Sequence, residues 1–340
     1  MGSGAAFHRL PGEWELPATL VFILRRALQV APVVLAIAAL NFVLLHLAPG
    51  DAADIIAARS GGSDVEFVEE LKRSFGLDRP VYQQFFIYIG KLMTFDLGYS
   101  HVQATPVIDL ILDRVPATLL LMISSIGIAI LVGIVLGILS AMRHRSWMDA
   151  IVSVLALLVY ATPQFWLGLM LIVLFSITFG ILPSGGMMTI AREMTTPERI
   201  LDVARHLVLP SLTLGLFYVA VYARLMRSSM LEVFTLDFIT TARAKGLSEA
   251  RVSLAHAARN ALLPVVTLAG VQVGHLLGGS ILVETVFGWP GLGRLVFDAL
   301  LQRDLNLLLG ILFVSSIVVV LANLVVDLIY GLLDPRIVHK

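Results

Sequence analysis

The chain is organised around the stretch Asp237-Phe-Ile-Thr-Thr-Ala-Arg-Ala-Lys-Gly-Leu-Ser-Glu-Ala-Arg-Val-Ser-Leu-Ala-His-Ala-Ala-Arg-Asn-Ala-Leu-Leu-Pro264, which separates two long apolar runs. We call residues 237–264 the elbow. Together with Arg224 and Arg227 just before it, this polar stretch carries six of the 24 Lys and Arg residues of the chain. Charged residues are costly inside a bilayer, so we expect the elbow to lie in water between two membrane-spanning segments.

Local signals predict two short helices within the elbow. The carboxylate of Asp237 can accept the free amide hydrogens of the first turn and so cap the first helix. Arg243 and Lys245 fall in its last turn, where cations face the partial negative charge of the helix end. Gly246 can take the left-handed conformation that ends a helix, and Ser248 can begin the next one. We therefore expect a rigid turn between two helices.

The composition indicates a membrane protein. The chain has 340 residues, of which 58% are hydrophobic and 14% are charged, and its mean hydropathy is +0.91. A soluble domain is nearer half apolar and a quarter charged. The net charge of zero gives no indication of nucleic-acid binding. Because the chain has no cysteine, disulfides, thiolate catalysis and cysteine-based metal sites are excluded.

Six apolar runs are long enough to cross a bilayer. They are residues 27–46, 117–142, 150–179, 207–226, 262–286 and 305–333. Twenty residues span roughly 30 Å as a helix, which is the thickness of a bilayer core. A cleaved signal peptide is the alternative for the first run, but its apolar region is normally shorter. We therefore predict an all-α integral membrane protein with six transmembrane helices and both termini on one side.

Basic residues are distributed unequally between the two sides. Thirteen lie in the tails, in the loop after the second run and around the elbow, whereas the two short loops on the opposite side hold five. The positive-inside rule therefore predicts that both termini and the elbow are cytoplasmic. The resulting division is a cytoplasmic tail at 1–24 and a membrane domain at 25–340. This domain contains an external loop at about 47–116 and a cytoplasmic loop at about 227–261.

The external loop is too long and too patterned to be a simple connection. Ser63-Asp-Val-Glu66 is a capping box, which predicts the start of an amphipathic helix. A second amphipathic helix is predicted after Pro80, with Tyr82 and Phe86 among its apolar residues. Such helices need an apolar surface to lie on. A structural cap over the spans and a docking surface or gate are both consistent with this pattern.

Glycines recur at helical spacing in two of the runs. Gly133 and Gly137 form one pair four residues apart, and Gly270, Gly274 and Gly278 form two overlapping pairs. Glycines at this spacing share a helix face and let two backbones approach closely, which is how helices pack in lipid. We expect both sets to mark contacts between helices.

A few polar residues fall at membrane depth. Burying them is costly, so each should face protein or a water-filled path. Four of them are candidates for a translocation path: Gln164, Gln272, His275 and Asn323.

Several sequence signatures are absent. There is no G-x-x-x-x-G-K-[ST] phosphate loop, so the chain does not bind a nucleotide in that way. H-E-x-x-H and G-x-S-x-G are also missing, so neither a zinc protease nor a hydrolase is supported. A DNA-reading helix pair does not suit the elbow, because the elbow lies between two spans. A secondary transporter or channel is one alternative, but it would not need the elbow. A membrane enzyme is another, but it would need a cluster of catalytic residues near one interface, and the sequence shows none.

The elbow residues match a known family. Thr240-Thr-Ala-Arg-Ala-Lys-Gly-Leu-Ser248, followed by His256 and by Arg259-Asn-Ala-Leu-Leu-Pro264, resembles the cytoplasmic loop of permeases of the dipeptide, oligopeptide and nickel family of ABC importers. The resemblance covers nearly the whole chain from Arg25 onward. Further matching blocks, in chain order, are Leu47-Ala-Pro-Gly-Asp51, Gly76-Leu-Asp-Arg-Pro80, Asp96-Leu-Gly-Tyr-Ser100, Leu182-Pro-Ser-Gly-Gly186, Glu284-Thr-Val-Phe-Gly-Trp-Pro-Gly-Leu-Gly293 and Leu333-Asp-Pro-Arg336.

One block departs from the general pattern of ABC importer permeases, which reads E-A-A, three residues, G, nine residues, I-x-L-P. Thr240-Thr-Ala242 replaces E-A-A here, and Leu263-Pro264 comes later than that spacing requires. Permeases of the peptide type are similar to this chain in both respects. The long external loop also resembles that of the first of the two permeases in such importers.

The resemblance implies a type I ABC importer permease fold in which the elbow contains the coupling helix, seated in a groove on a separate ATPase subunit. The coupling residues implied are Asp237, Thr240, Thr241, Ala242, Arg243, Ala244, Lys245, Gly246 and Leu247. The small side chains allow close seating, and Arg243 and Lys245 reach acidic or carbonyl groups of the partner. A short stiff helix packed between two spans moves as a body, so ATPase closure could be transmitted to the spans.

The resemblance also implies the assembly and the cargo. The chain itself binds no cofactor and is not an enzyme, whereas ATP and Mg²⁺ are held by two partner ATPase subunits. A second, homologous permease forms the other half of the path, and a periplasmic or lipid-anchored solute-binding protein delivers the cargo in the bacterial inner membrane. Peptides are the expected cargo. Nickel chelates, glutathione and opines are alternatives carried by similar permeases.

Overall fold

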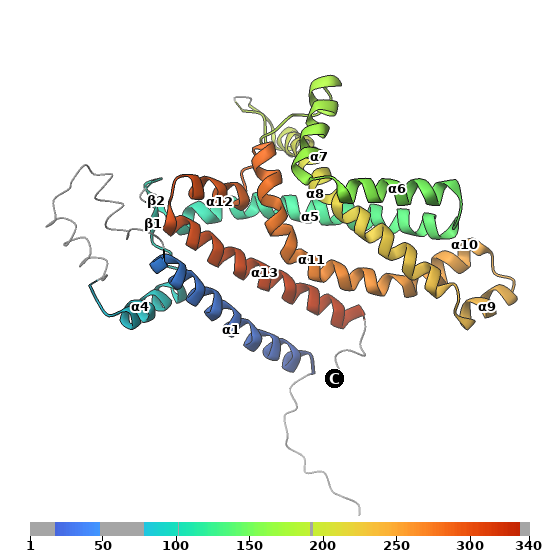
Figure 1. Cartoon of the computed structure of the whole chain (residues 1–340), viewed down its shortest axis with the longest axis horizontal. Helices are drawn as coiled ribbons and strands as arrows, with labels where there is room; N and C mark the ends of the chain where they lie inside the picture. The colour runs from blue at the N-terminus through green and yellow to red at the C-terminus, as the bar shows by residue number, and fades with distance from the viewer. Residues whose placement is uncertain (1–17, 48–77, 101, 191–192, 334–340) are drawn as a thin grey trace, which may run out of the picture.

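The computed structural model describes residues 18–47, 78–100, 102–190 and 193–333, and this part of the chain is mostly helical (Figure 1). A short antiparallel hairpin pairs Tyr99 with Pro106 and Ser100 with Thr105. The elements in chain order are α1 (Ala18–Leu47), α4 (Val81–Met93), β1 (Tyr99–Ser100), β2 (Thr105–Pro106), α5 (Val107–Met142), α6 (Trp147–Ala161), α7 (Gln164–Leu171), the π-helical η1 (Ile172–Thr178), α8 (Thr196–Val233), α9 (Asp237–Ala244), α10 (Glu249–Arg251), the π-helical η2 (Val252–Ala257), α11 (Ala258–Phe287), α12 (Leu292–Leu301) and α13 (Leu305–Leu333).

All six predicted apolar runs fall on helices. Four stretches are individually long and apolar enough to cross a membrane, namely α5, α8, residues 249–270 and residues 305–324, and the bent pair of α6 with α7–η1 adds a fifth. Within α1 the stretch Ala31–Leu44 is apolar but shorter than these. The prediction of an all-helical protein with several membrane spans is confirmed.

The third apolar run is not one straight span, as predicted, but two helices that meet at 109° (Figure 1). The break follows from Pro163. The ring of a proline disfavours the helical conformation for the residue before it, and Thr162 is extended, with φ −83° and ψ 130°. Pro163 then precedes the first residue of α7.

Three helices begin earlier than hydropathy alone indicates. α1 starts at Ala18, inside the predicted tail, and α5 starts at Val107, inside the predicted external loop. α8 starts at Thr196 through the capping box Thr195–Glu198. The added turns of α5 and α8 carry charges, among them Asp109 and Arg199, so an apolar window excludes them although the backbone continues as a helix.

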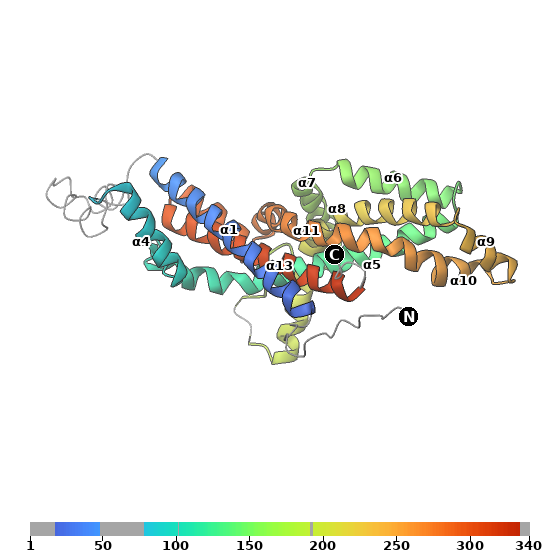
Figure 2. The ribbon, with the colours of Figure 1, turned by 90° about the horizontal axis from the view of Figure 1, so that it is seen from below.

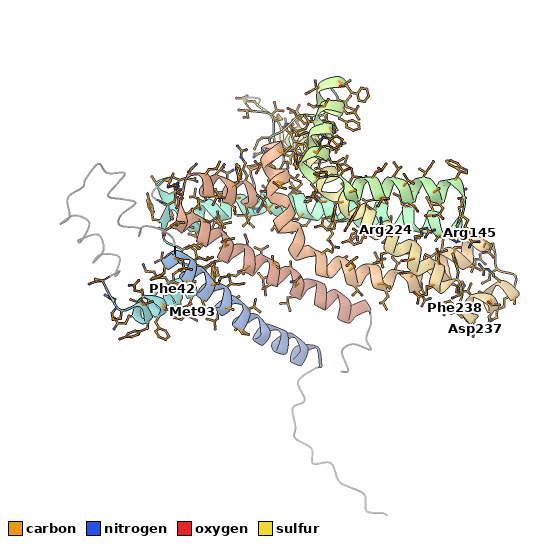
Figure 3. The ribbon with its side chains drawn as sticks, in the orientation of Figure 1. Phe42, Met93, Arg145, Arg224, Asp237 and Phe238 are labelled. Atoms are coloured by element: carbon orange, nitrogen blue, oxygen red, sulfur yellow. The ribbon has the colours of Figure 1, made fainter. Side chains whose placement is uncertain are left out.

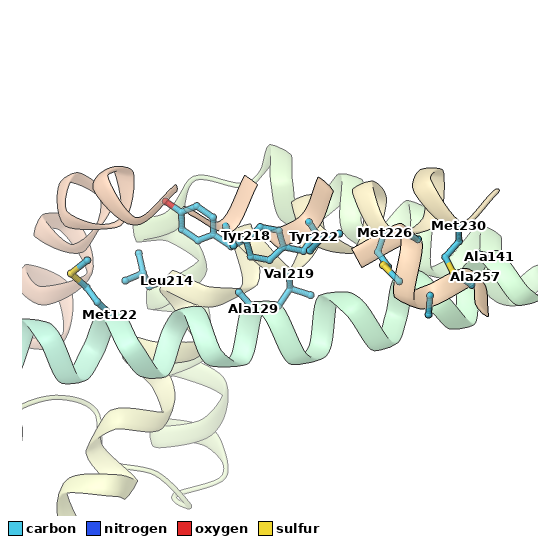
Figure 4. Packing of buried hydrophobic residues seen from close by; sticks show 14 of the residues in the cluster. Met122, Ala129, Ala141, Leu214, Tyr218, Val219, Tyr222, Met226, Met230 and Ala257 are labelled. Atoms are coloured by element: carbon cyan, nitrogen blue, oxygen red, sulfur yellow. The ribbon is translucent and has the colours of Figure 1, made fainter. Parts of the chain in front are cut away.

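The core of the bundle is the contact between α5 and α8. A Cβ atom built at Gly133 would lie 2.8 Å from Cβ of Tyr222, and one at Gly137 would lie 2.6 Å from Cβ of Met226. Both glycines therefore let the two backbones approach closely, as predicted. Figure 4 shows Tyr222 and Met226 of α8 directed toward α5. The other glycine set differs at Gly278, which is exposed and, among the described residues, has no atom within 4 Å of a built Cβ.

The second predicted helix of the external loop is confirmed as α4. It begins after Pro80 and packs on α1, where Phe42 contacts the rings of Phe85 and Tyr88 at centroid distances of 5.2 and 5.7 Å. Phe42 and Met93 are labelled in Figure 3. The helix predicted from the capping box Ser63–Glu66 lies outside the described residues.

The elbow and α4 lie at opposite ends of the longest axis of the molecule in both Figure 1 and Figure 2. We call these the elbow end and the far end. A second apolar cluster toward the far end joins α12 to α13, α5 and α1 through buried residues that include Leu295, Ala299, Ile311 and Ala38. The site at the elbow end is therefore separated from α4 and the hairpin by the length of the bundle.

Candidate functional site: the elbow

The first elbow helix, α9, begins one residue earlier than a cap at Asp237 would require. The N-cap position is occupied by Leu236, whose backbone is extended, and Asp237 is the first helical residue. No side-chain hydrogen bond caps this helix, so the prediction of Asp237 as the cap was wrong. The carboxylate still lies in the first turn, where the helix dipole favours an anion.

The end of α9 is the predicted glycine turn. Gly246 has φ +77°, which is the left-handed conformation. Its N–H donates to the carbonyl of Arg243 at 2.9 Å, and the N–H of Leu247 donates to the carbonyl of Ala242 at 3.4 Å. These two bonds form a Schellman motif, which satisfies carbonyls left unpaired at a helix end. A Cβ at Gly246 would meet no atom within 4 Å, so the glycine is required by the backbone angle and not by space.

The second elbow helix is not short. Val252 and Ala258, where α10 passes into η2 and η2 into α11, are both in the right-handed helical conformation, and the helix runs from Glu249 to Phe287. The prediction of two short helices was therefore wrong for the second one. The polar residues after Ser248 form the first turns of a membrane span, so only the four residues 245–248 separate α9 from a helix that enters the bundle.

One face of α9 is fixed to the bundle. Ile239 and Ala242 are buried, and both belong to the apolar cluster that includes Val252 and Ala257 of η2. Ala242 therefore packs inside this chain, which corrects its predicted contribution to an outer contact surface. The opposite face is exposed and carries Asp237, Phe238, Thr240, Thr241, Arg243, Ala244 and Lys245. Figure 3 shows Asp237 and Phe238 at this end of the molecule.

Arg243 crosses the turn to the next helix. Its Nε donates to Oε1 of Glu249 at 2.9 Å, and its terminal nitrogen donates to Oε2 at 3.2 Å. The guanidinium also lies over the ring of Phe234, with its central carbon 5.8 Å from the ring centre. The sequence assigned Arg243 to a partner, whereas the structure uses it to brace the turn. Lys245 is exposed at the end of the helix.

A buried carboxylate holds the helices that support the elbow. Asp149 of α6 is 5% exposed, and Arg227 of α8 donates to its two oxygens at 2.6 and 2.8 Å. The hydroxyl of Ser140 on α5 and the amide of Arg145 also donate to it, at 2.5 and 3.0 Å. This one group therefore ties α5, α6 and α8 together beside the elbow.

Sequence reasoning missed Asp149. The available signal was Ser146, three residues earlier, because Ser-x-x-Asp before an apolar run is a helix-start pattern. The structure bears this out, since the hydroxyl of Ser146 accepts a hydrogen bond from the amide of Asp149 at 3.3 Å. The partner Arg227, by contrast, is distant in sequence, and nothing in the sequence pairs the two residues.

The four candidate path residues lie on three helices. Gln164 is half-buried at the start of α7, directly after the 109° bend, and Gln272 is half-buried on α11. Asn323 is exposed on α13, and the side chain of His275 lies outside the described residues. Within the described part of the chain, no group of three or more His, Asp or Glu side chains is placed to hold a metal ion. The path assignment stays a prediction.

The elbow is therefore a projecting polar helix whose buried face packs on the bundle and whose turn is braced by the Arg243–Glu249 pair.

Two family models match the chain. Residues 133–339 match the binding-protein-dependent transport system inner membrane component, and residues 19–122 match the N-terminal part of such membrane components.

Individual relatives are similar over nearly the whole chain. The chain is 41% identical over 338 residues to the dipeptide transport system permease protein DppB of Escherichia coli, covering 94% of this chain and 99% of that protein. It is 40% identical over 319 residues to the oligopeptide transport system permease protein AppB of Bacillus subtilis, covering 93% and 98%. The identity is also 40% over 319 residues to the glutathione transport system permease protein GsiC of Escherichia coli, covering 94% and 99%.

A solved structure shares the fold. Inward-facing MetNI, a methionine ABC transporter, contains a chain that matches with a TM-score of 0.54 and 19% sequence identity, covering 67% of this chain and 98% of the other. The family models and the relatives at about 40% identity agree with one another. The chain belongs to the family of inner-membrane components of binding-protein-dependent transport systems, the permease subunits of ABC importers.

Proposed function

We propose that this chain forms half of the translocation path of an ATP-driven importer of peptides, and that the elbow couples it to an ATPase subunit. The observation that carries this proposal is the elbow itself. Its exposed polar face projects from one end of the bundle, while Ile239 and Ala242 fix it to the helices behind. Relatives named for dipeptide and oligopeptide transport support peptides as the cargo.

The coupling residues divide by role. Asp237, Thr240, Thr241, Ala244 and Lys245 are exposed and form the surface that seats on the ATPase. Gly246, Leu247 and the Arg243–Glu249 pair hold the shape of the turn, and Ala242 anchors the helix. Because α10, η2 and α11 are continuous from Glu249 onward, a displacement of α9 acts on a membrane span four residues later. A packed helix transmits such a displacement as a body.

Membership of the permease family supports the rest of the proposed assembly. The chain has no phosphate loop, so ATP and Mg²⁺ are held by two partner ATPase subunits. A second permease completes the path, and a solute-binding protein delivers cargo on the side opposite the elbow. The excess of basic residues around the elbow and the tails supports a position for them on the cytoplasmic side of a bacterial inner membrane.

A cross-linking experiment tests the proposed coupling. The chain has no native cysteine, so Ala244→Cys gives a single reactive thiol on the exposed face of α9. In the assembled complex we expect a short thiol-directed photocross-linker on this residue to capture an ATPase subunit. Leu301→Cys, which is 68% exposed near the end of α12, is the matched control and should capture none. Equal capture at both positions, or none at Ala244→Cys, would remove the coupling role.

Glutathione is a second candidate cargo, favoured by the similarity to GsiC. Uptake by the reconstituted importer separates the two. We expect unlabelled dipeptides and oligopeptides to compete with a labelled dipeptide at lower concentration than glutathione does. Stronger competition by glutathione would select it as the cargo.

A further inference from the structure

The carboxylate of Glu284 is fully buried near the end of α11, away from the elbow. The hydroxyl of Thr118 on α5 donates to Oε1 at 2.9 Å, and the amide of Arg294 in α12 donates to Oε2 at 3.0 Å. The amide of Gly293 and the side chain of Ser280 also hydrogen-bond to it. Among the described residues its partners are therefore hydroxyls and backbone amides, and none is a cationic side chain.

The sequence after Glu284 leaves room for this carboxylate. A Cβ atom at Gly291 would lie 2.4 Å from the carboxylate carbon, and one at Gly293 would lie 3.0 Å from Oε2. These two glycines flank Leu292, the first residue of α12. The first amides of a helix lack partners within the helix, and an anion is stabilised there. Glu284 supplies that anion from a different helix.

Further bonds converge on the same place. The hydroxyl of Thr118 also accepts from the amide of Leu292 at 2.7 Å, and Nε1 of Trp289 donates to the carbonyl of Ala117 at 2.8 Å. The carbonyl of Phe287 accepts from the amide of Gly186, in the loop before α8, at 2.7 Å. We call this set, centred on Glu284, the junction. It joins α5, α11, α12 and the α7–α8 connection.

We infer that Glu284 is a positioning residue that clamps α12 onto α5 and α11. α12 is short and buries Leu292, Leu295 and Ala299 on one side, while Leu300 and Leu301 are exposed. An apolar contact alone would let such a helix slide along its neighbours. A buried carboxylate, by contrast, costs free energy in every position of α12 in which it lacks hydrogen-bond donors. The clamp therefore selects one seat for α12. The inference rests on the proposed function only in placing α12 on the external side of the importer.

Thiol labelling of the purified full-length chain tests the clamp, because the chain has no native cysteine. Leu295→Cys, 4% exposed under α12, should react slowly with a maleimide. Glu284→Gln replaces one acceptor oxygen with an amide nitrogen that faces N–H and O–H donors. Leaving these donors unpaired should loosen α12, and we expect labelling of Leu295→Cys to become about tenfold faster.

One control separates a clamp from a general loss of structure. Met226→Cys, in the α5–α8 core, should stay unreactive in the Glu284→Gln background. If both thiols become reactive together, Glu284 maintains the whole fold and the proposed clamp is wrong. An unchanged rate at Leu295→Cys would also overturn it.

A second pair of variants keeps the test valid if Glu284→Gln does not fold. Thr118→Val removes the bridging hydroxyl at nearly constant shape, and Thr118→Ser retains it. We expect Thr118→Val to speed labelling of Leu295→Cys and Thr118→Ser to leave it slow. Equal rates in the two Thr118 variants would contradict the clamp. None of these readouts depends on transport, so their outcome is distinguishable from a failure of the coupling proposal.

Discussion

The elbow end and the junction each bury one carboxylate, and they satisfy it differently. Asp149 at the elbow end receives two hydrogen bonds from Arg227, a long side chain on another helix. Glu284 at the junction receives its bonds from hydroxyls and from amides at the start of α12. A side-chain ion pair between helices can be broken and remade as the helices shift. Bonds to backbone amides fix the position of a whole helix. Two of the four described bonds to Asp149 come from one side chain on α8, whereas two of those to Glu284 come from the first amides of α12.

The largest expected effect is at the elbow end. Arg227→Met leaves Asp149 buried without its cation, which in buried pairs costs about 3–5 kcal/mol. We expect a marked loss of thermal stability of the purified chain. The double variant Arg227→Met with Asp149→Asn removes both charges and should recover most of it, as a double-mutant cycle would show. If the double variant is as unstable as the single one, the two residues are not an ion pair that supports α8.

The next largest loss of stability is expected at the junction, where the Glu284 carboxylate leaves no space for a side chain at Gly291. Gly291→Ala places a methyl group where the Glu284 carboxylate lies, 2.4 Å from its carbon, and overpacking of this kind costs about 1–3 kcal/mol. Gly278→Ala is the matched control, because no atom of the described part of the chain lies within 4 Å of a Cβ built there. In detergent, the melting temperature of Gly291→Ala should be clearly lower than that of Gly278→Ala. Equal melting temperatures would mean that the carboxylate is not held in this cradle.

Substitution of Gly246 in the elbow should impair the protein for a different reason, namely backbone strain. Gly246 has φ +77° and open space around its Cβ, so Gly246→Val introduces only backbone strain, about 1–2 kcal/mol. Straightening the turn would relieve the strain and displace α9, so we expect transport and cargo-stimulated ATP hydrolysis to fall together. Gly246→Asn should be milder, because Asn tolerates the left-handed conformation. Identical behaviour of the two variants would show that the angle is unimportant.

The smallest effect is expected at the exposed pair of the elbow. Arg243 and Glu249 are 42% and 66% exposed, and solvent-exposed pairs contribute about 0–1 kcal/mol. Glu249→Gln should therefore change the melting temperature little, in contrast to Arg227→Met. Adding salt to the wild-type chain should have a similarly small effect. A large loss of stability in Glu249→Gln would mean that the turn depends on this pair more than its exposure allows.

Features that depend on local chemistry could be predicted from the sequence. Gly246 as a left-handed helix end, the close contact at Gly133 and Gly137, and α4 after Pro80 are all confirmed. Each follows from one residue type and its spacing along the chain. The predicted apolar runs also coincide with helices, because hydropathy decides which segments enter a membrane.

Features that depend on tertiary contacts could not be predicted in this way. The partners of Asp149 and Glu284 lie up to 166 residues away in the chain, and no spacing rule links them. Ala242 is among the coupling residues that the family resemblance implies, but the bundle behind α9 buries it. The bend at Thr162 was missed although Pro163 was visible, because an apolar window does not register the backbone effect of a proline.

The proposed importer has the elbow and α12 on opposite sides of the membrane, and thiol labelling of intact cells tests this placement most directly. Ser248→Cys lies in the exposed turn of the elbow, and Leu301→Cys lies at the exposed end of α12. A thiol reagent that does not cross the inner membrane should label Leu301→Cys while that membrane is intact. It should label Ser248→Cys only after the cytoplasm has been opened. Labelling of Ser248→Cys in cells with an intact inner membrane would contradict the account.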